Sequence, residues 1–232
     1  MKPANVLVLL LAIAIGTVAA VVSMRSVWKD AERLAFHGRP GMGAFGGGNY
    51  QWMSDDQLEA LVARTPENGL AMVQFARRVE SRGEIDRARQ LYKSGLEKIE
   101  RWIHEAGGRG DVKENWYHKG LALRGLGLER EATSAFHRSF AFQRVLCERL
   151  LEDPRERLRA EEFYNLACFG ALAGLEDEAL DALDRAIAFG FSRLDLLQRD
   201  MDLDALREHP RFIAMLARVV GVPALADGDP SP

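Results

Sequence analysis

Cysteine is scarce in this chain, with two residues, Cys147 and Cys168, among 232. Two cysteines are too few to staple a small secreted domain, so the fold must rest on a hydrophobic core. Both fall inside segments that we expect to be helical. We therefore expect two small buried hydrophobic residues, and a disulfide between neighbouring helices is the alternative.

An excess of positive charge is also missing. The chain has 31 basic and 34 acidic residues and a formal net charge of -3, and the two signs are mixed along its length. Because such a chain has no basic field to hold phosphate backbones, we do not expect nucleic acid as a partner.

Motifs for catalysis and for metal binding are lacking as well. The five histidines include no pair four residues apart with a carboxylate between them, and there is no Cys-x-x-Cys. No serine or cysteine has a plausible base at motif spacing. The many aspartates and glutamates are expected on solvated helix faces or at helix caps. We therefore predict no enzyme activity, no metal, no cofactor and no small-molecule substrate.

One long apolar run is present, from residue 4 to residue 24, and its polar side chains are Asn5, Thr17 and Ser23. As a helix it would reach about 31 Å, enough to cross the hydrocarbon core of a bilayer. We predict that residues 1–24 are a transmembrane anchor. A signal peptide cleaved after Ala19 or Ala20 is the alternative, although apolar residues continue past both sites.

Two features of the sequence indicate opposite orientations for this anchor. Arg25, Lys29 and Arg33 after the run outnumber Lys2 before it, which favours a cytoplasmic domain. The usual N-terminal signal anchor keeps its short amino end inside. We expect the latter arrangement, which puts the domain on the periplasmic or outer side.

Residues 25–50 are expected to form a juxtamembrane helix and then a linker. Six glycines and a proline between residues 38 and 48 cannot sustain a helix or a strand. A lead-in helix is predicted within residues 51–65, with Ser54 as N-cap, Gln57 completing a capping box and Met53 packing on Leu58. Thr65 and Pro66 are predicted to start the next helix.

Three similar units follow, over residues 66–189. Each has a large apolar residue, a small residue four positions later, a glycine, and an alanine five positions after that glycine. The three sets are Met72, Ala76, Gly83 and Ala88; Trp116, Gly120, Gly127 and Ala132; Phe163, Ala167, Gly174 and Ala179. This pattern predicts three helical hairpins, in which the glycine ends the first helix and the alanine lets the second approach closely.

The pattern resembles that of the tetratricopeptide-repeat (TPR) family, most closely over Phe163 to Ile187. Departures are Lys119 where the family prefers leucine, Gly170 where it prefers an aromatic residue, and Gly95 and Ser139 where it prefers alanine. The glycines are 44 and 47 residues apart, against a family period of about 34. We therefore predict long second helices, from Glu84 to about Glu105 and from Glu129 to about Leu151.

The resemblance implies an all-α, TPR-like α-solenoid of about three hairpins, preceded by one transmembrane helix. Residues 190–221 resemble the closing block that follows the last repeat in bacterial members, with short helices beginning near Ser192, Asp202 and Pro210. Such a block covers the apolar face of the last repeat. The tail, residues 222–232, is expected to be disordered.

Members of the family bind partners on the concave face that the first helices form. The resemblance places three residues of each unit there: Val73, Gln74 and Arg77; Tyr117, His118 and Leu121; Tyr164, Asn165 and Cys168. The family's clamp for a C-terminal carboxylate is absent, because Arg77 alone supplies positive charge and Glu161 stands where a lysine is needed.

From these positions we predict partner contacts by Arg77, Tyr117, His118, Leu121, Tyr164 and Asn165, with Tyr164 and Asn165 exposed. The alternative is that one or more of Tyr117, His118 and Tyr164 pack between helices.

The function that we expect is a membrane-anchored TPR scaffold for protein–protein interaction, an accessory or assembly subunit of a membrane or envelope complex. Its partners would be other proteins, with the membrane held through residues 4–24. The alternative is a cleaved, secreted or periplasmic TPR protein that binds peptides as a co-chaperone.

Overall fold

The computed structural model describes residue 50 and residues 53–105, 112–152 and 159–220. Within these ranges the regular structure is entirely helical. None of the helices found there is both long enough and apolar enough to cross a membrane. The anchor predicted at residues 4–24, the glycine-rich linker and the C-terminal tail all lie outside the described residues.

The lead-in helix α2 spans Asp55–Arg64 and begins as predicted. The hydroxyl of Ser54 accepts from the backbone N–H of Gln57 at 3.2 Å, and the Gln57 side chain accepts from the N–H of Ser54 at 2.9 Å. The prediction that Thr65 caps the next helix is wrong. Its hydroxyl donates to the carbonyl of Leu61 at 2.7 Å and so closes α2, while Asn68 caps the helix that follows.

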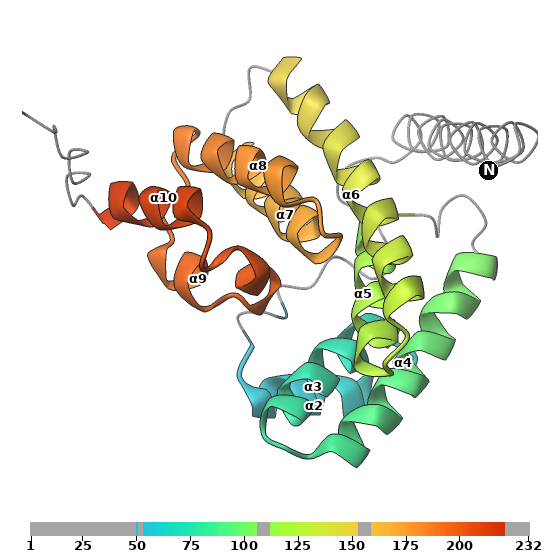
Figure 1. Cartoon of the computed structure of the whole chain (residues 1–232). Helices are drawn as coiled ribbons and strands as arrows, with labels where there is room; N and C mark the ends of the chain where they lie inside the picture. Colours follow the sequence, from blue (N-terminus) through green and yellow to red (C-terminus); the bar gives the residue numbers. More distant parts are fainter. Residues whose placement is uncertain (1–49, 51–52, 106–111, 153–158, 221–232) are drawn as a thin grey trace, which may run out of the picture.

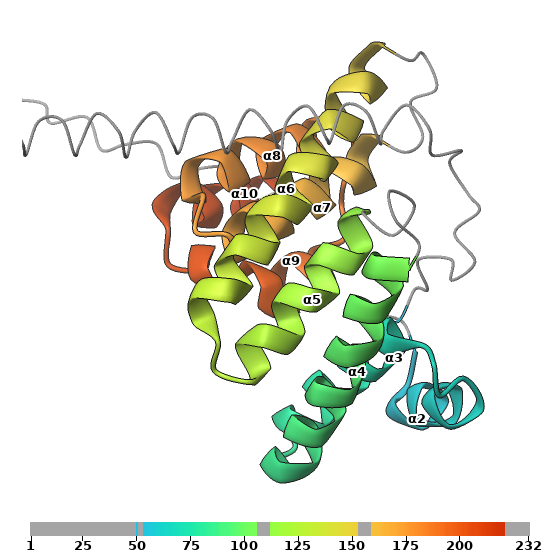
Figure 2. The ribbon, with the colours of Figure 1, turned by 90° about the vertical axis from the view of Figure 1, so that its right-hand side faces the viewer.

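Three helical hairpins follow α2 and stack in chain order (Figure 1). They consist of α3 (Gly69–Ser81) with α4 (Ile85–Glu105), α5 (Lys113–Gly125) with α6 (Glu129–Glu152), and α7 (Arg159–Leu172) with α8 (Glu176–Ala188). In Figure 2, α4, α5 and α6 lie side by side as neighbouring rods. The long second helices, α4 and α6, are confirmed.

Glycine ends the first helix of every hairpin, as predicted. Gly83, Gly127 and Gly174 have φ values of 83°, 79° and 75°, in the left-handed region that favours glycine. At each turn the residue after the glycine donates its N–H to a carbonyl five residues earlier, as Leu128 does to Leu123 at 2.9 Å. This is the Schellman arrangement, which satisfies the last carbonyls of the helix.

Small residues let the two helices of a hairpin approach closely. Ala88, Ala132 and Ala179 are at most 1% exposed. A side chain on Gly170 would meet the Cβ of Ala179 at 3.0 Å, which explains why this position carries no aromatic residue. Gly120 is tighter still, because its face is covered by the ring of Phe136.

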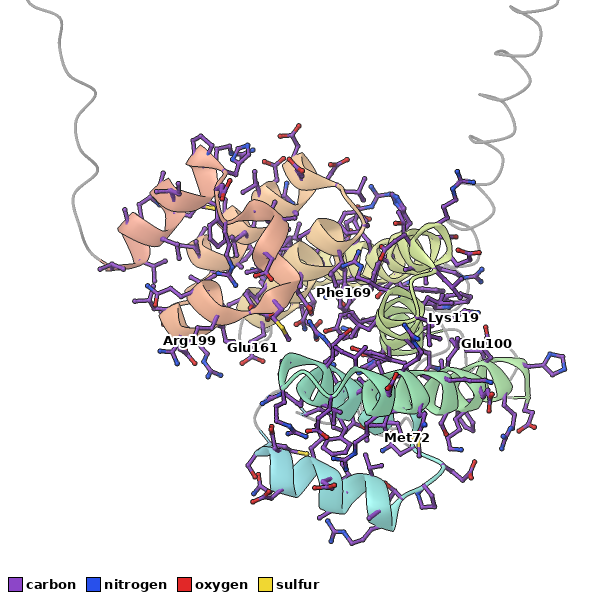
Figure 3. All side chains as sticks on the ribbon, turned by 60° about the horizontal axis from the view of Figure 1, so that its bottom comes forward. Met72, Glu100, Lys119, Glu161, Phe169 and Arg199 are labelled. Carbon is purple, nitrogen blue, oxygen red and sulfur yellow. The ribbon has the colours of Figure 1, made fainter. Side chains whose placement is uncertain are left out.

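Neighbouring hairpins are also joined by polar contacts. Lys119, on α5, extends toward Glu100 on α4, and their charged groups lie 2.7 Å apart (Figure 3). The ammonium group of Lys119 also lies 5.4 Å from the ring centre of Trp116. A lysine in place of the family's leucine therefore links the long α4 to the next hairpin.

The closing block consists of α9 (Leu194–Arg199), the 3-10 helix η4 (Met201–Leu206) and α10 (Pro210–Val220). The starts of these elements lie within two residues of the predicted ones. Five of their apolar side chains, Leu197, Leu203, Leu206, Phe212 and Met215, are at most 4% exposed. The all-α, TPR-like solenoid with a closing block is thus confirmed for the described residues.

Replacing Gly120 by alanine tests the close approach in the second hairpin. Alanine normally stabilises a helix interior relative to glycine, by about 0.5–1 kcal/mol. Here the added methyl group would force the ring of Phe136 to move, so we expect Gly120→Ala to lower the free energy of unfolding by about 1–3 kcal/mol. Urea unfolding measures this, with the exposed Ser134→Ala on α6 as the control. An unchanged or increased stability of Gly120→Ala would contradict the packing described.

Candidate functional site

The first helices of the three hairpins, α3, α5 and α7, present polar side chains to a common face, and η4 of the closing block lies against it. We call the set Gln74, Arg77, Tyr117, His118 and Tyr164 the first-helix face. These residues come from all three hairpins, so the face exists only when the hairpins are stacked.

Asp202 of η4 is the centre of the contacts with this face. Its carboxylate forms an ion pair with Arg77, with 2.7 Å between Oδ1 and Nη2, and accepts from the Tyr117 hydroxyl at 2.6 Å. Arg77 also donates to the Tyr117 oxygen at 3.3 Å. Asp202 is 3% exposed and the Arg77 side chain 15%. The first two hairpins are therefore tied to the end of the fold by one buried carboxylate.

Asp200 makes the equivalent contact with the third hairpin. Its Oδ2 accepts from the Tyr164 hydroxyl at 2.7 Å, and its Oδ1 accepts from the backbone N–H of Asp202 at 3.0 Å. The ring of Tyr164 stacks on Phe191, with ring centres 4.2 Å apart. All three hairpins thus contact a single short segment of chain.

The charges at this site do not balance. Two carboxylates, of Asp200 and Asp202, lie near one guanidinium, that of Arg77, which pairs with Asp202; among the described residues no cation forms an ion pair with Asp200. Burial, followed by the neighbouring Asp202 carboxylate, raises the pKa of Asp200 from 3.8 to about 6. Burial and then Asp202 raise the pKa of Tyr117 as well, so that this hydroxyl remains a donor.

His118 is buried between α3 and α5 as a neutral side chain. Its Nδ1 lies 2.7 Å from the carbonyl oxygen of Glu114, which can only accept, so Nδ1 carries the proton. Its Nε2 then accepts from the Gln74 amide at 3.2 Å. Burial lowers the pKa of His118 to about 4, against the effect of the Glu114 carbonyl.

The predicted site residues are therefore mostly internal. Tyr117, His118, Leu121 and Tyr164 are at most 6% exposed, which confirms the alternative that the aromatic residues pack between helices. The expectation that Tyr164 would be exposed is wrong, because Phe191 and Asp200 cover it. Asn165 is partly exposed and hydrogen-bonds Glu162. Partner binding by these six residues stays a prediction.

Sequence reasoning missed the two aspartates that complete the site. It assigned acidic residues to solvated faces or caps, which is wrong for Asp202. The available signal was the apolar pattern around the pair, because Leu203 and Leu206 indicate a segment with a buried side.

Cys168 lies beside the two aspartates, and the three side chains bring potential metal-ligand atoms within 4.8 Å of one another. Their charge is directed to the protein's own donors, since Arg77 and Tyr117 hold Asp202 and Tyr164 holds Asp200. Burial and then Asp200 raise the pKa of the Cys168 thiol, which disfavours the thiolate that a metal needs. Both cysteines are free and buried, so the disulfide alternative is wrong.

A separate hollow lies at the start of α7 and holds about 390 Å³. Phe189, Gly190, Phe191, Ser192 and Arg193 form one side of it, and Ala160 and Glu161 the other. It contains none of the predicted partner-binding residues. Glu161 lies at this end of α7, whereas Phe169 lies towards the middle of the fold (Figure 3).

Comparison with known proteins yields distant structural similarity and no sequence match. No protein-family model matches the chain, and no curated protein matches it. A crystal structure of MamA aligns with a TM-score of 0.35 and 13% identity, over 72% of this chain and 85% of that one. A crystal structure of YrrB, described as a TPR protein with an unusual peptide-binding site, aligns at 0.27 and 15%, over 73% and 94%. Similarity this distant supports no detailed argument, and the assignment of the fold rests on the hairpins themselves.

The raised pKa of Asp200 makes a prediction about stability and pH. The folded state binds the proton of Asp200 more tightly than the unfolded state does. The contribution of this proton to the free energy of unfolding is therefore fully present below about pH 4 and is lost as the pH rises through 6. Asp200→Asn is neutral at every pH. It should therefore gain about 1–3 kcal/mol of stability relative to the parent chain at pH 7.5, and this gain should shrink towards pH 4.

Urea unfolding of both chains at pH 4.5, 6 and 7.5 measures this difference. The stability that the neutral His118 contributes to the fold is lost as the pH falls below 6.5. His118 is present in both chains, so this effect cancels in the difference between them. A difference that does not change with pH would contradict a buried, charge-repelled Asp200.

Proposed function

We propose that this chain is a non-enzymatic, membrane-anchored scaffold that binds a protein partner through its first-helix face. One observation carries the proposal, namely that all three first helices contribute a donor that holds one short acidic segment, in this structure the chain's own residues 200–206. A face that holds such a segment in cis has the chemistry to hold one in trans.

The contacts define the chemistry of the partner segment. Arg77 and Tyr117 hold one carboxylate, and Tyr164 holds a second carboxylate two residues earlier. Leu203 and Leu206, both 0% exposed, follow the second aspartate. The matching ligand is a segment with two acidic residues at alternate positions and leucines one and four positions after the second, which is an ordinary mode of peptide recognition.

The state of the titratable groups supports a scaffold rather than an enzyme. In the first-helix face the hydroxyls of Tyr117 and Tyr164 have raised pKa values and donate to carboxylates. The free nitrogen of His118 is occupied by Gln74. A general base or nucleophile needs a group that is poised near neutral pH and accessible to substrate, and these groups lack one or both properties.

The membrane anchor comes into the proposal from the apolar run at residues 4–24. Together with the glycine-rich linker it would hold the repeat domain near the bilayer, on the periplasmic or outer side, while the domain contacts other subunits. Such a chain would act in the assembly of a membrane or envelope complex.

Site-specific photocrosslinking in intact membranes tests this function. A photoreactive residue at Asn165, the partly exposed position beside the face, should crosslink to a specific protein, and one at Ser134 on the outer side of α6 should not. Residues 4–24 should keep the chain in the membrane pellet through an alkaline wash, and its mass should show no loss of about 2 kDa from cleavage.

Two results would contradict the proposal. If the photoreactive residues at Asn165 and Ser134 give identical crosslinks, partner binding is not specific to the first-helix face. A smaller, released chain would replace the anchored scaffold with the cleaved, peptide-binding alternative.

A further inference from the structure

The segment that fills the first-helix face is part of the same chain, and it behaves as a bound ligand would. Asp202 is 125 residues from Arg77 and 85 from Tyr117 in sequence, and Asp200 is 36 from Tyr164. The segment brings two carboxylates to donors on three separate hairpins, and its two leucines, Leu203 and Leu206, are buried. While it is in place, no other segment can use those donors.

We propose that residues 200–206 are an internal ligand that keeps the first-helix face closed, and that an acidic partner segment binds after they are released. This inference rests on the proposed function, because it concerns the regulation of the same face. It makes the closing block a competitor of the partner as well as a cap for the last repeat.

The polar contacts of the segment are suited to a reversible hold. Asp200 and Asp202 repel one another, and Arg77 pairs directly with Asp202 alone. The remaining groups that face Asp200 are the neutral Tyr164 and Cys168 on α7 and Tyr117 on α5. A partner segment with better-spaced carboxylates would escape this repulsion and could displace the internal one.

A second set of hydrogen bonds, made by a residue outside the first-helix face, also holds the segment. Arg207, directly after η4, donates to the carbonyls of Gln198 and Asp200, and to the Asp204 carboxylate at 2.7 Å. Its contacts involve no residue of the first-helix face. Removing Arg207 should therefore loosen the segment without removing any of the side-chain contacts between the two aspartates and the face.

Binding of a labelled probe peptide to the full chain in mild detergent tests the inference. The probe is a capped copy of residues 200–206, Asp-Met-Asp-Leu-Asp-Ala-Leu. Loss of the Arg207 contacts should raise the affinity of Arg207→Ala for the probe about tenfold over the parent chain. Arg218→Ala, which removes an exposed ion pair between α10 and α8, is the matched control and should bind as the parent does.

Hydrogen exchange of the amides of residues 201–206 is measured on the same chains. Asp202→Asn weakens the contact of the segment with Arg77. It is the second test variant and replaces Arg207→Ala if that variant does not fold. The expected result is faster exchange together with tighter probe binding, and no binding of a probe whose first two aspartates are asparagines.

The other outcomes separate the two proposals. If the probe binds the parent chain as tightly as it binds Arg207→Ala, residues 200–206 do not compete for the face. That result would overturn the internal ligand as a proposal but would leave the proposed binding face standing. Unchanged exchange and unchanged probe affinity in both variants would likewise overturn it. Faster exchange without any probe binding would overturn the proposed function, and the inference with it.

Discussion

The ion pair between Arg77 and Asp202 is the contact on which the arrangement of this fold depends most. It joins the first hairpin to the closing block across 125 residues of sequence, and Tyr117 binds the same carboxylate from the second hairpin. Burying two charges costs free energy that a single attraction seldom returns in full, whereas removing one partner leaves the other charge buried and unpaired. Such a contact adds little to the stability of the fold but strongly favours one placement of the segments that it joins. It selects the one placement of η4 in which Arg77, Tyr117 and Tyr164 all have acceptors.

Steric constraints in the hairpins make this contact possible. Left-handed glycines turn the chain, and Ala88, Ala132 and Ala179 admit the neighbouring helix, so the three first helices lie next to one another. Their polar side chains can then converge on a segment as short as η4. The longer α4 and α6 add contacts such as Lys119 with Glu100 at the outer ends of the stack. Repetition thus supplies the surface, and the non-repeating closing block supplies what occupies it.

Most of the fold could be predicted from local rules. The capping box at Ser54, the glycine turns and the lengths of α4 and α6 depend on residues close in sequence, and all were predicted correctly. The start of α3 was not, because Thr65 and Asn68 are both good caps and their competition is decided by tertiary contacts, such as that of Asn68 with Tyr50. Of the site, only the residues on the first helices could be predicted. The repeats placed Arg77, Tyr117 and Tyr164 on one face. The apolar pattern of Leu203 and Leu206 indicates that the segment after Asp200 has a buried side, but it does not indicate which surface that side covers.

A double-mutant cycle on Arg77 and Asp202 tests the central claim most directly. The free energies of unfolding of Arg77→Gln, Asp202→Asn and the double variant, with the parent chain, give the coupling between the two side chains. A direct, buried contact predicts a coupling of at least about 1.5 kcal/mol, and the exposed pair Arg218 and Asp184, treated in the same way, should give a value near zero. A coupling between Arg77 and Asp202 as small as that of the exposed pair would show that η4 does not dock on the first hairpin in solution.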